Sequence, residues 1–243
     1  MRKYTYKIIV FAFIGTLIMS CSSNKTYKIS SPSKNNTLTF DLTKSGAPQY
    51  QFSSDGKSVI EPSLLGFEFQ GLSKMTEGFE VINTEQNTIN TQWDQPWGEF
   101  RTIRDNHTEL IVHLKESNGE QRLVDLIFRV FDFGLGFRYS FPKQPNLDKV
   151  KISNEITQFT FADDNEVWWI PVHRENSYYE SFYRKTAMSK TDTINTPATF
   201  ETKDKLYLAI HEANLTDFAS MTLLKSGENQ YKSDLVPWAD GVK

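Results

Sequence analysis

The stretch VDLIFRVFDFGLGFRYSF, Val124–Phe141, decides the fold class. Apolar side chains recur at every second position in both halves, which places them on one face of an extended strand. They are Val124, Leu126, Phe128 and Val130 in the first half, and Leu135, Phe137, Tyr139 and Phe141 in the second. The segment Asp132–Gly134 between the halves is a turn signal, so the stretch predicts a hairpin of two long strands.

The same period of two recurs along most of the chain. TLTFDL at 37–42, ELIVHL at 109–114 and KLYLAI at 205–210 each place three apolar side chains on one face. Turn residues in SSDGKS, ESNGEQ, PKQPN and KSGENQ separate the apolar runs. No segment shows a helical period beyond one or two turns. Many strands with turns between them predict an all-β fold built as a large β-sandwich.

The N-terminus reads as an export signal ahead of the fold. Residues 1–20 combine a basic start with the run IIVFAFIGTLIM, which is too short for a permanent membrane span. The run ends in IMSC, so we expect cleavage before Cys21 and lipid attachment to its thiol, as in bacterial lipoproteins; a chance free cysteine is the alternative. Residues 21–34 are then expected to form a lipidated polar tether, and residues 35–243 one β domain. No acidic run follows Cys21, which favours the periplasmic side of the outer membrane over the cell surface.

Composition excludes several classes of function. The net charge of −3 and a pI near 5.9 leave no basic surface for nucleic acid. Cys21 is the single cysteine, so neither a disulfide nor a thiolate metal site is expected. None of the four histidines pairs with another at metal-ligand spacing, which argues against zinc. The chain also lacks GxSxG, SxxK and a phosphate-binding glycine loop, so it carries no nucleophile motif.

Three stretches concentrate side chains that could form a site. QPWGEFRTIRDNHTEL carries Trp97 and Glu99 just ahead of a strand. HEANLTDFASMTL places His211 and Glu212 at a strand end beside a loop, where binding residues tend to lie. WWIPVHRENSYYESFYRKT, residues 168–186, gathers aromatics, a histidine and two glutamates around one proline. By residue type alone, each stretch could equally be a structural strand edge.

Together these stretches resemble the N-terminal domain of glycoside hydrolase family 97, which contains α-glucosidases and α-galactosidases. Five blocks match in order from about residue 30 onward: WGEFRTIRDNHTEL, FRVFDFGLGFRYSFP, WWIP…SYYESFYR, TPATFETKDKLYLAIHEANLTDFASMTL and VPWADGVK. The resemblance implies a β-super-sandwich, galactose-mutarotase-like, that packs against a catalytic (β/α)8 barrel. The barrel, which would carry the catalytic residues, is absent from this chain. We therefore expect that the chain is truncated before the barrel and that it is inactive alone.

The resemblance also implies that this domain gives one glutamate to a Ca²⁺ ion shared with the barrel. The matching position is Glu180, and Glu175 is a rival. Ca²⁺ takes about six to eight oxygen ligands, so one carboxylate cannot complete its shell. Beside the scissile bond of an α-linked oligosaccharide, the ion would polarise the glycosidic oxygen. The residues expected to line the sugar pocket or the domain interface are Trp97, Glu99, His211 and Glu212.

Two other classes of function remain open on the residues alone. A stand-alone sugar-binding lipoprotein would need exposed aromatic platforms on a closed sandwich. A structural lipoprotein would dock a partner through the apolar face around residues 168–186.

Overall fold

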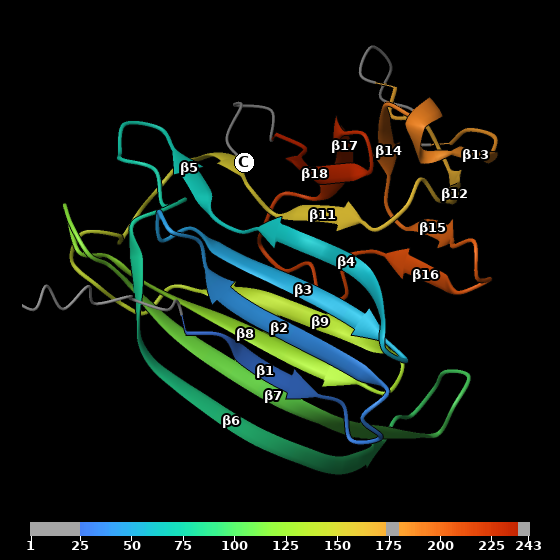
Figure 1. The fold of residues 1–243 in the computed structure, drawn as a ribbon, viewed down its shortest axis with the longest axis horizontal. Helices are drawn as coiled ribbons and strands as arrows, with labels where there is room; N and C mark the ends of the chain where they lie inside the picture. Colours follow the sequence, from blue (N-terminus) through green and yellow to red (C-terminus); the bar gives the residue numbers. More distant parts are fainter. Residues whose placement is uncertain (1–24, 174–179, 238–243) are drawn as a thin grey trace, which may run out of the picture.

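The computed structural model describes residues 25–173 and 180–237, and these form an all-β fold (Figure 1). Their only helical element is a 3-10 turn, η1 (Met188–Lys190). The strands are β1 (Tyr27–Ser30), β2 (Asn36–Leu42), β3 (Pro48–Ser54), β4 (Lys57–Leu64), β5 (Phe67–Phe69), β6 (Phe79–Asp94), β7 (Thr102–Glu116), β8 (Leu123–Phe131), β9 (Gly134–Ser140), β10 (Ile152–Glu155), β11 (Gln158–Phe161), β12 (Glu166–Trp169), β13 (Arg184–Ala187), β14 (Thr193–Asn195), β15 (Ala198–Glu201), β16 (Tyr207–Ile210), β17 (Met221–Gly227) and β18 (Gln230–Leu235). Within the described residues, no helix is long and apolar enough to cross a membrane.

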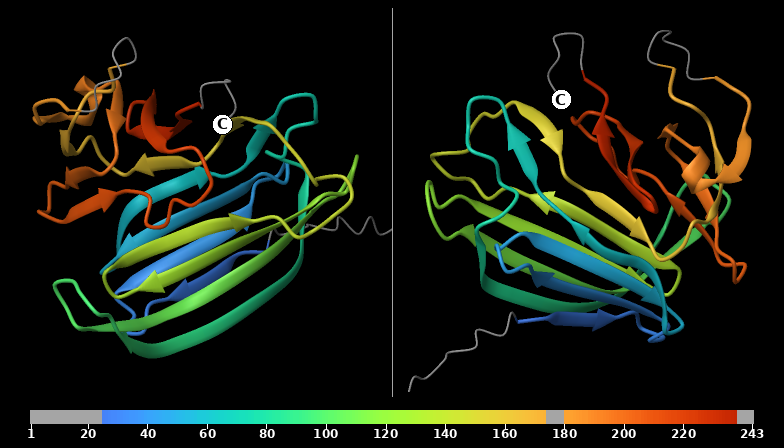
Figure 2. Two further views of the ribbon diagram at one scale, coloured as in Figure 1. Left: turned by 180° about the vertical axis from the view of Figure 1, so that it is seen from behind. Right: turned by 45° about the horizontal axis from the view of Figure 1, so that its top comes forward.

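The strands form one wide sheet and three smaller ones. The wide sheet has eight strands in the order β1-β2-β3-β4-β11-β18-β17-β14. Two four-stranded sheets, β6-β7-β8-β9 and β13-β12-β15-β16, and a short pair, β10-β5, complete the described fold. Figure 2 shows the β6–β9 sheet lying across the β1–β4 half of the wide sheet. The large β-sandwich expected from the sequence is therefore confirmed.

Aromatic side chains form the core between the wide sheet and the β6–β9 sheet. Phe40 lies 5.8 Å from Phe128, and Tyr50 lies 5.3 Å from Phe137, measured between ring centroids. Phe128 and Phe137 belong to the β8–β9 hairpin, whose strands meet at the turn predicted over residues 132–134. The inward alternation expected for Leu110, Val112 and Leu114 and for the first half of the hairpin is confirmed, because all of these side chains are buried.

The other half of the wide sheet packs against the β12–β16 sheet. The Phe200 ring lies 4.6 Å from Phe161 and 5.9 Å from Tyr231. Cross-strand partners link Phe52 to Ile60 and Ile60 to Phe161, and residues paired in this way share a face. Phe52 lies two residues from Tyr50 on β3, so the face that covers Phe128 is the same face that covers Phe200. One face of the wide sheet is thus covered by two smaller sheets, which is the arrangement of a super-sandwich.

Strand β1 corrects the tether expected over residues 21–34. Tyr27–Ser30 pairs with β2 along its whole length. Ile29 is buried, and the Tyr27 ring lies 6.3 Å from Phe40, so the short alternation Tyr27–Ile29 is enough to add a strand. The domain therefore begins near residue 27 rather than 35. The preceding signal segment and Cys21 lie outside the described residues.

The β6–β7 hairpin extends well beyond its sheet. β7 pairs with β6 from Thr102 to Glu116, but it pairs with β8 only from His107 to Lys115. The distal part of the hairpin is therefore a two-stranded arm, which projects at one end of the molecule (Figure 1). Aromatic side chains are exposed on this arm and at its tip: Trp93, Trp97 and Phe100.

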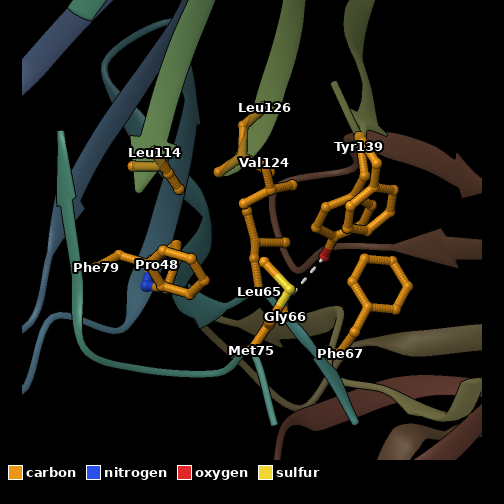
Figure 3. Close-up of a pocket in the computed structure, with 11 residues that line it drawn as sticks. Pro48, Leu65, Gly66, Phe67, Met75, Phe79, Leu114, Val124, Leu126 and Tyr139 are labelled. Carbon is orange, nitrogen blue, oxygen red and sulfur yellow. Dashed lines mark hydrogen bonds between the residues drawn. The ribbon is translucent and has the colours of Figure 1, made fainter. Parts of the chain in front are cut away.

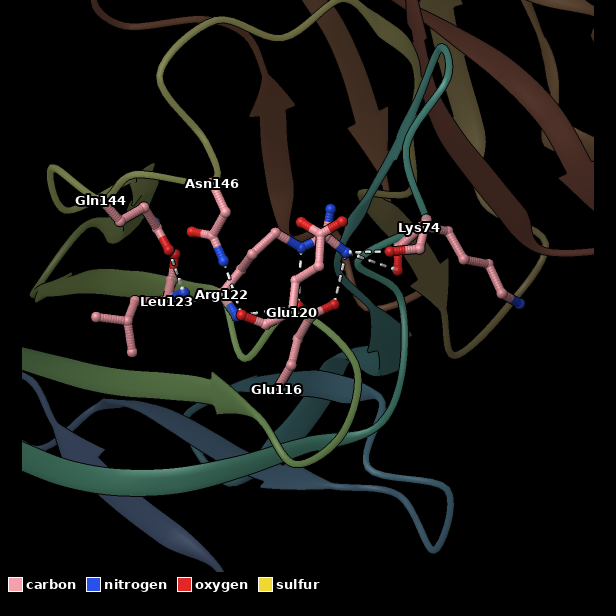
Figure 4. A network of polar contacts seen from close by, with 8 residues as sticks. Lys74, Glu116, Glu120, Arg122, Leu123, Gln144 and Asn146 are labelled. Atoms are coloured by element: carbon pink, nitrogen blue, oxygen red, sulfur yellow. Dashed lines mark hydrogen bonds and ion pairs between the residues drawn. The ribbon is translucent and has the colours of Figure 1, made fainter.

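A buried ion pair between Arg122 and Glu116 stabilises the β7–β8 turn, and Arg122 also connects this turn to the segment after β5 (Figure 4). The Arg122 Nε and Nη2 atoms donate to the two oxygens of Glu116 at 2.8 and 2.6 Å. Nη2 also donates to Ser73 Oγ at 2.8 Å, which ties the turn to residues that lie about 50 positions earlier. Both charged side chains are buried, and the hydrogen bonds that Arg122 donates to Glu116 raise the pKa of the Arg122 guanidinium.

Candidate functional site

The segment that carries Glu180 is held at both ends by strands. β12 pairs with β13, and the Trp169 indole donates a hydrogen bond to Thr186 Oγ1 at 3.0 Å. The Arg184 guanidinium lies 5.2 Å from the centre of the Trp169 ring, which adds a cation–π contact. Trp169 is buried, so its indole ring contributes to the packing of the strand. The two ends of the connection between β12 and β13 are therefore held by paired strands.

The first residues of this connection are also fixed to β14. The Val172 N–H donates to the carbonyl of Thr193 at 3.2 Å, and the Asn195 side chain donates to the carbonyl of Pro171 at 3.0 Å. His173 Nε2 then lies 3.4 Å from Ser181 Oγ, so the two ends of the connection face each other. Glu180 immediately precedes Ser181 in the chain.

Glu180 is an exposed carboxylate beside exposed aromatic rings. Phe182 is 93% exposed and Tyr183 is 63% exposed. No ion pair joins Glu180 to another described residue. Large apolar side chains that are this exposed, next to an available carboxylate, are typical of a surface that another protein segment covers. Glu175, Tyr178 and Tyr179 lie outside the described residues.

The described residues do not form a complete metal site around Glu180. Within residues 25–173 and 180–237, no group of three or more His, Cys, Asp or Glu side chains is arranged to hold a metal ion. An exposed carboxylate can give one or two oxygens to Ca²⁺, whose remaining ligands would have to come from elsewhere.

His211 and Glu212 follow β16, as the sequence predicted, and they differ in environment. Glu212 accepts a hydrogen bond from the Met221 N–H at 3.0 Å, so it closes the loop that leads into β17. His211 is exposed. Glu212 thus has a structural role in the described fold.

Trp97 and Glu99 lie at the tip of the β6–β7 arm, in a different sheet from the other candidates. Both side chains are exposed, and Trp97 is 84% exposed. Gln95 Nε2 donates to the carbonyl of Phe100 at 2.7 Å, which shapes the tip. The structure does not gather the predicted residues into one described cluster, so their assignment to a sugar pocket or an interface stays a prediction.

Glu155 at the end of β10 is a buried carboxylate that the sequence analysis did not identify. Burial raises its pKa to about 7, the hydrogen bond from Thr157 opposes the rise, and the negative charge of Glu212 adds to it. Thr157 Oγ1 lies 2.5 Å from Glu155 and 2.7 Å from the Tyr139 hydroxyl, which accepts from the Gly66 N–H at 3.4 Å (Figure 3). Nothing in the local sequence ISNEITQF marks Glu155, because its burial depends on distant strands.

Glu155→Gln is expected to raise the free energy of unfolding at pH 8 by about 3 kcal/mol. In the unfolded chain the carboxyl ionises near its ordinary pKa of 4.5, whereas in the fold it ionises near 7. The folded state therefore binds the extra proton between these values, and stability falls as the pH rises through this window. Urea unfolding at pH 5 and pH 8 should show a flatter pH dependence for Glu155→Gln than for wild type. Exposed Glu228→Gln is the control, and an equal pH dependence in all three proteins would contradict the prediction.

A small void in the core is too small to bind a ligand (Figure 3). Its volume is about 10 Å³, and apolar residues of both sheets line it, including Leu65, Met75 and Leu126. A cavity needs at least about 10–15 Å³ to hold even one water molecule. This void is a packing defect rather than a site.

Comparison with known proteins agrees with this geometry. The family model described as Glycosyl-hydrolase 97 N-terminal matches residues 29–238. A probable retaining alpha-galactosidase from Streptomyces bingchenggensis is 26% identical over 223 residues, which are 88% of this chain and 34% of that protein. Structures of a Glycoside Hydrolase Family 97 enzyme from Pseudoalteromonas sp., in complex with panose and with acarbose, superpose with a TM-score of 0.84 at 35% identity.

The match covers 89% of this chain but only 33% of the Pseudoalteromonas enzyme. The chain therefore spans about a third of the length of the relatives it matches. The matched third is their N-terminal part, and it holds the same antiparallel sheets. This chain belongs to the glycosyl-hydrolase 97 N-terminal family.

Proposed function

We propose that this chain is the N-terminal domain of an exo-acting α-glycosidase, an α-glucosidase or α-galactosidase, that packs on a catalytic (β/α)8 barrel of the same polypeptide. The observation that carries the proposal is the superposition, with a TM-score of 0.84, on one third of an enzyme that binds panose. The substrate class that follows is an α-linked oligosaccharide. The exposed aromatic rings of Phe182 and Tyr183 support a covered surface at the β12–β13 connection.

Within this function, Glu180 is proposed to give one carboxylate to a Ca²⁺ ion at the boundary with the barrel. When bound, the ion would polarise the glycosidic oxygen and assist protonation of the leaving group. The role of this chain is to position the carboxylate: β12, β13 and β14 fix the ends of the connection, and the approach of His173 to Ser181 closes it. A ligand from this domain would couple metal binding to the docking of the two domains.

The chain alone is expected to show no hydrolysis of aryl α-glucosides or aryl α-galactosides above the uncatalysed rate. The reason is that the general acid and the base or nucleophile are expected on the barrel. The measurement is release of the aryl group with and without added Ca²⁺. Turnover by purified chain, abolished by mutation within residues 25–237, would refute the division of labour proposed here.

The coding sequence after the Lys243 codon gives a second, independent test. The proposal expects an open frame that continues into a barrel with carboxylates at strand ends. A stop codon directly after Lys243 would instead favour a sugar-binding or structural role for this gene product.

We also propose that the protein is an exported lipoprotein, acylated at Cys21, on the periplasmic side of the outer membrane. The apolar run ending in IMSC supports this proposal. Labelling with a palmitate analogue should mark the wild type and leave Cys21→Ala unmarked. Equal labelling of both proteins would exclude Cys21 as the attachment site.

A further inference from the structure

Strand β6 leaves a long backbone edge unpaired in the described fold. It is the outermost strand of the β6-β7-β8-β9 sheet, and it pairs on one side only, with β7. Figure 1 shows β6 along the lower rim of the molecule. The N–H and C=O groups on its other side face no strand within residues 25–173 and 180–237. A row of unpaired backbone groups is a template for pairing with another strand.

This edge lacks the residues by which proteins usually protect a free strand. Protected edges are typically short or carry lysine or proline. Beyond its register shift, β6 runs from Asn83 to Asp94 without a lysine, an arginine or a proline. Its two charged side chains have partners in the same copy: Glu85 lies 3.2 Å from His113 Nε2, and Asp94 lies 3.3 Å from Arg101 Nε. The edge is therefore nearly neutral and open to pairing.

The order of side chains along β6 is self-complementary for antiparallel pairing. Two large apolar side chains of this strand are exposed, Ile82 at 52% and Trp93 at 51%. Ile82 lies six residues before Thr88, and Trp93 lies five residues after it. A second copy that pairs antiparallel about Thr88 would therefore bring Trp93 of each copy next to Ile82 of the other, at both ends of the contact.

The centre of the same register pairs neutral polar side chains. Thr88 faces Thr88 of the second copy, and Gln86 faces Asn90; all three side chains are exposed. Glu85 faces Thr91, so no like charges lie opposite each other, and threonine pairs across strands are favourable. A contact in which residue i meets j and j meets i closes with two-fold symmetry. The strand therefore fits a second copy of this chain.

We propose that the free edge of β6 is a homodimer interface, in which β6 of one copy pairs antiparallel with β6 of a second copy about Thr88. The two four-stranded sheets would then form one continuous sheet across the two-fold axis. The contact is narrow, so a Kd on the order of 10 μM is expected, as for weak, transient complexes. The inference goes beyond the proposed role of the domain in catalysis, because the edge belongs to this chain alone.

Sedimentation velocity of the purified chain, expressed without residues 1–21, tests the dimer. The chain is expected to shift from monomer to dimer between about 1 and 100 μM. Thr88→Lys places two ammonium groups opposite each other and should raise the Kd by about tenfold or more. Thr91→Lys is the matched control, because the same change three residues along the strand places each ammonium opposite Glu85 of the other copy and should not raise the Kd. Thermal unfolding of both variants checks that they fold.

Cysteine cross-linking tests the register. The chain without residues 1–21 has no native cysteine, so a thiol introduced in β6 can form a disulfide only between copies. Residues directly opposite each other in antiparallel strands have Cα atoms about 4.5–5.5 Å apart, which suits a disulfide. Thr88→Cys should therefore cross-link under mild oxidation. Thr84→Cys should not, because the two thiols would lie about 27 Å apart along the strands.

Several results would overturn the interface. A chain that stays monomeric at about 200 μM would exclude it, and a dimer of equal strength in Thr88→Lys would place the contact on another surface. Equal cross-linking of Thr84→Cys and Thr88→Cys would contradict the register. A monomeric polypeptide that includes the barrel, with the β6 amides protected from hydrogen exchange, would show that the barrel covers this edge instead. None of these measurements depends on glycoside hydrolysis or on Ca²⁺ binding, so they are separable from failure of the proposed function.

Discussion

Glu116→Ala is expected to lower the free energy of unfolding by about 3–5 kcal/mol, because it leaves the Arg122 guanidinium buried without its counter-charge. Arg122 has no exposed surface, and its Nη1 atom already lacks a partner, so it cannot turn to water without opening the β7–β8 turn. The loss would also release the contact to Ser73 that joins this turn to the segment after β5. Urea unfolding measured by fluorescence gives the change directly.

Two variants separate the buried charge from general damage to the turn. Glu120→Ala removes an exposed carboxylate from the same turn and should change the stability by less than about 1 kcal/mol. The double variant Glu116→Leu/Arg122→Met replaces both charges with apolar groups and should recover most of the loss. A double variant as unstable as Glu116→Ala would show that the turn geometry, rather than the unpaired charge, determines the effect.

Glu180→Gln is expected to weaken Ca²⁺ binding on the order of 100-fold in the polypeptide that includes the barrel. Changes to groups that only support a metal ligand already cost about 10–100-fold in affinity, and Glu180 is proposed to be a ligand itself. Glutamine keeps one oxygen donor but loses the negative charge that Ca²⁺ prefers. Calorimetric titration of the metal-free enzyme measures the affinity, and the Ca²⁺ concentration needed for half-maximal kcat/KM measures its effect on catalysis.

Glu175→Gln is the matched control for this experiment, since it removes the same group five residues earlier. It should leave the Ca²⁺ affinity unchanged. If Glu175→Gln weakened Ca²⁺ binding and Glu180→Gln did not, the ligand would be Glu175. That result would contradict the assignment of Glu180 as the Ca²⁺ ligand.

The fold could be predicted where the alternation of apolar residues is strong. The β8–β9 hairpin and the inner half of β7 follow directly from their sequence, because one face of β7 and of β8 is buried against the wide sheet and the apolar side chains of β9 pack, partly buried, against the same core. β6 was not predicted, since its sequence FEVINTEQNTINTQWD is polar on both faces of an edge strand and of the projecting arm. β1 was missed because two apolar residues among lysines and serines give too short a pattern.

The site could be predicted only as far as single residues within a local pattern. The alternation at residues 205–210 predicted the strand that ends just before His211 and Glu212, but the Glu212 contact with the Met221 N–H depends on the path of the following loop. Glu155 carries no local signal, because its burial comes from strands that are distant in sequence. The ion pair between Lys57 and Asp204 joins residues 147 positions apart, so no local sequence pattern predicts it.

Strands β1 and β14 are the two opposite edges of the wide sheet, and this determines which edge would lie near a bilayer. With lipid on Cys21, as proposed, the six steps of chain to Tyr27 reach at most about 20 Å, so the β1 edge would be tethered close to the lipid surface. The connection that carries Glu180 is attached to β14, seven strand spacings away, or about 34 Å at 4.8 Å per spacing. The tether would therefore keep the β1 edge near the lipid, while the connection that carries Glu180 is attached at the opposite edge of the wide sheet.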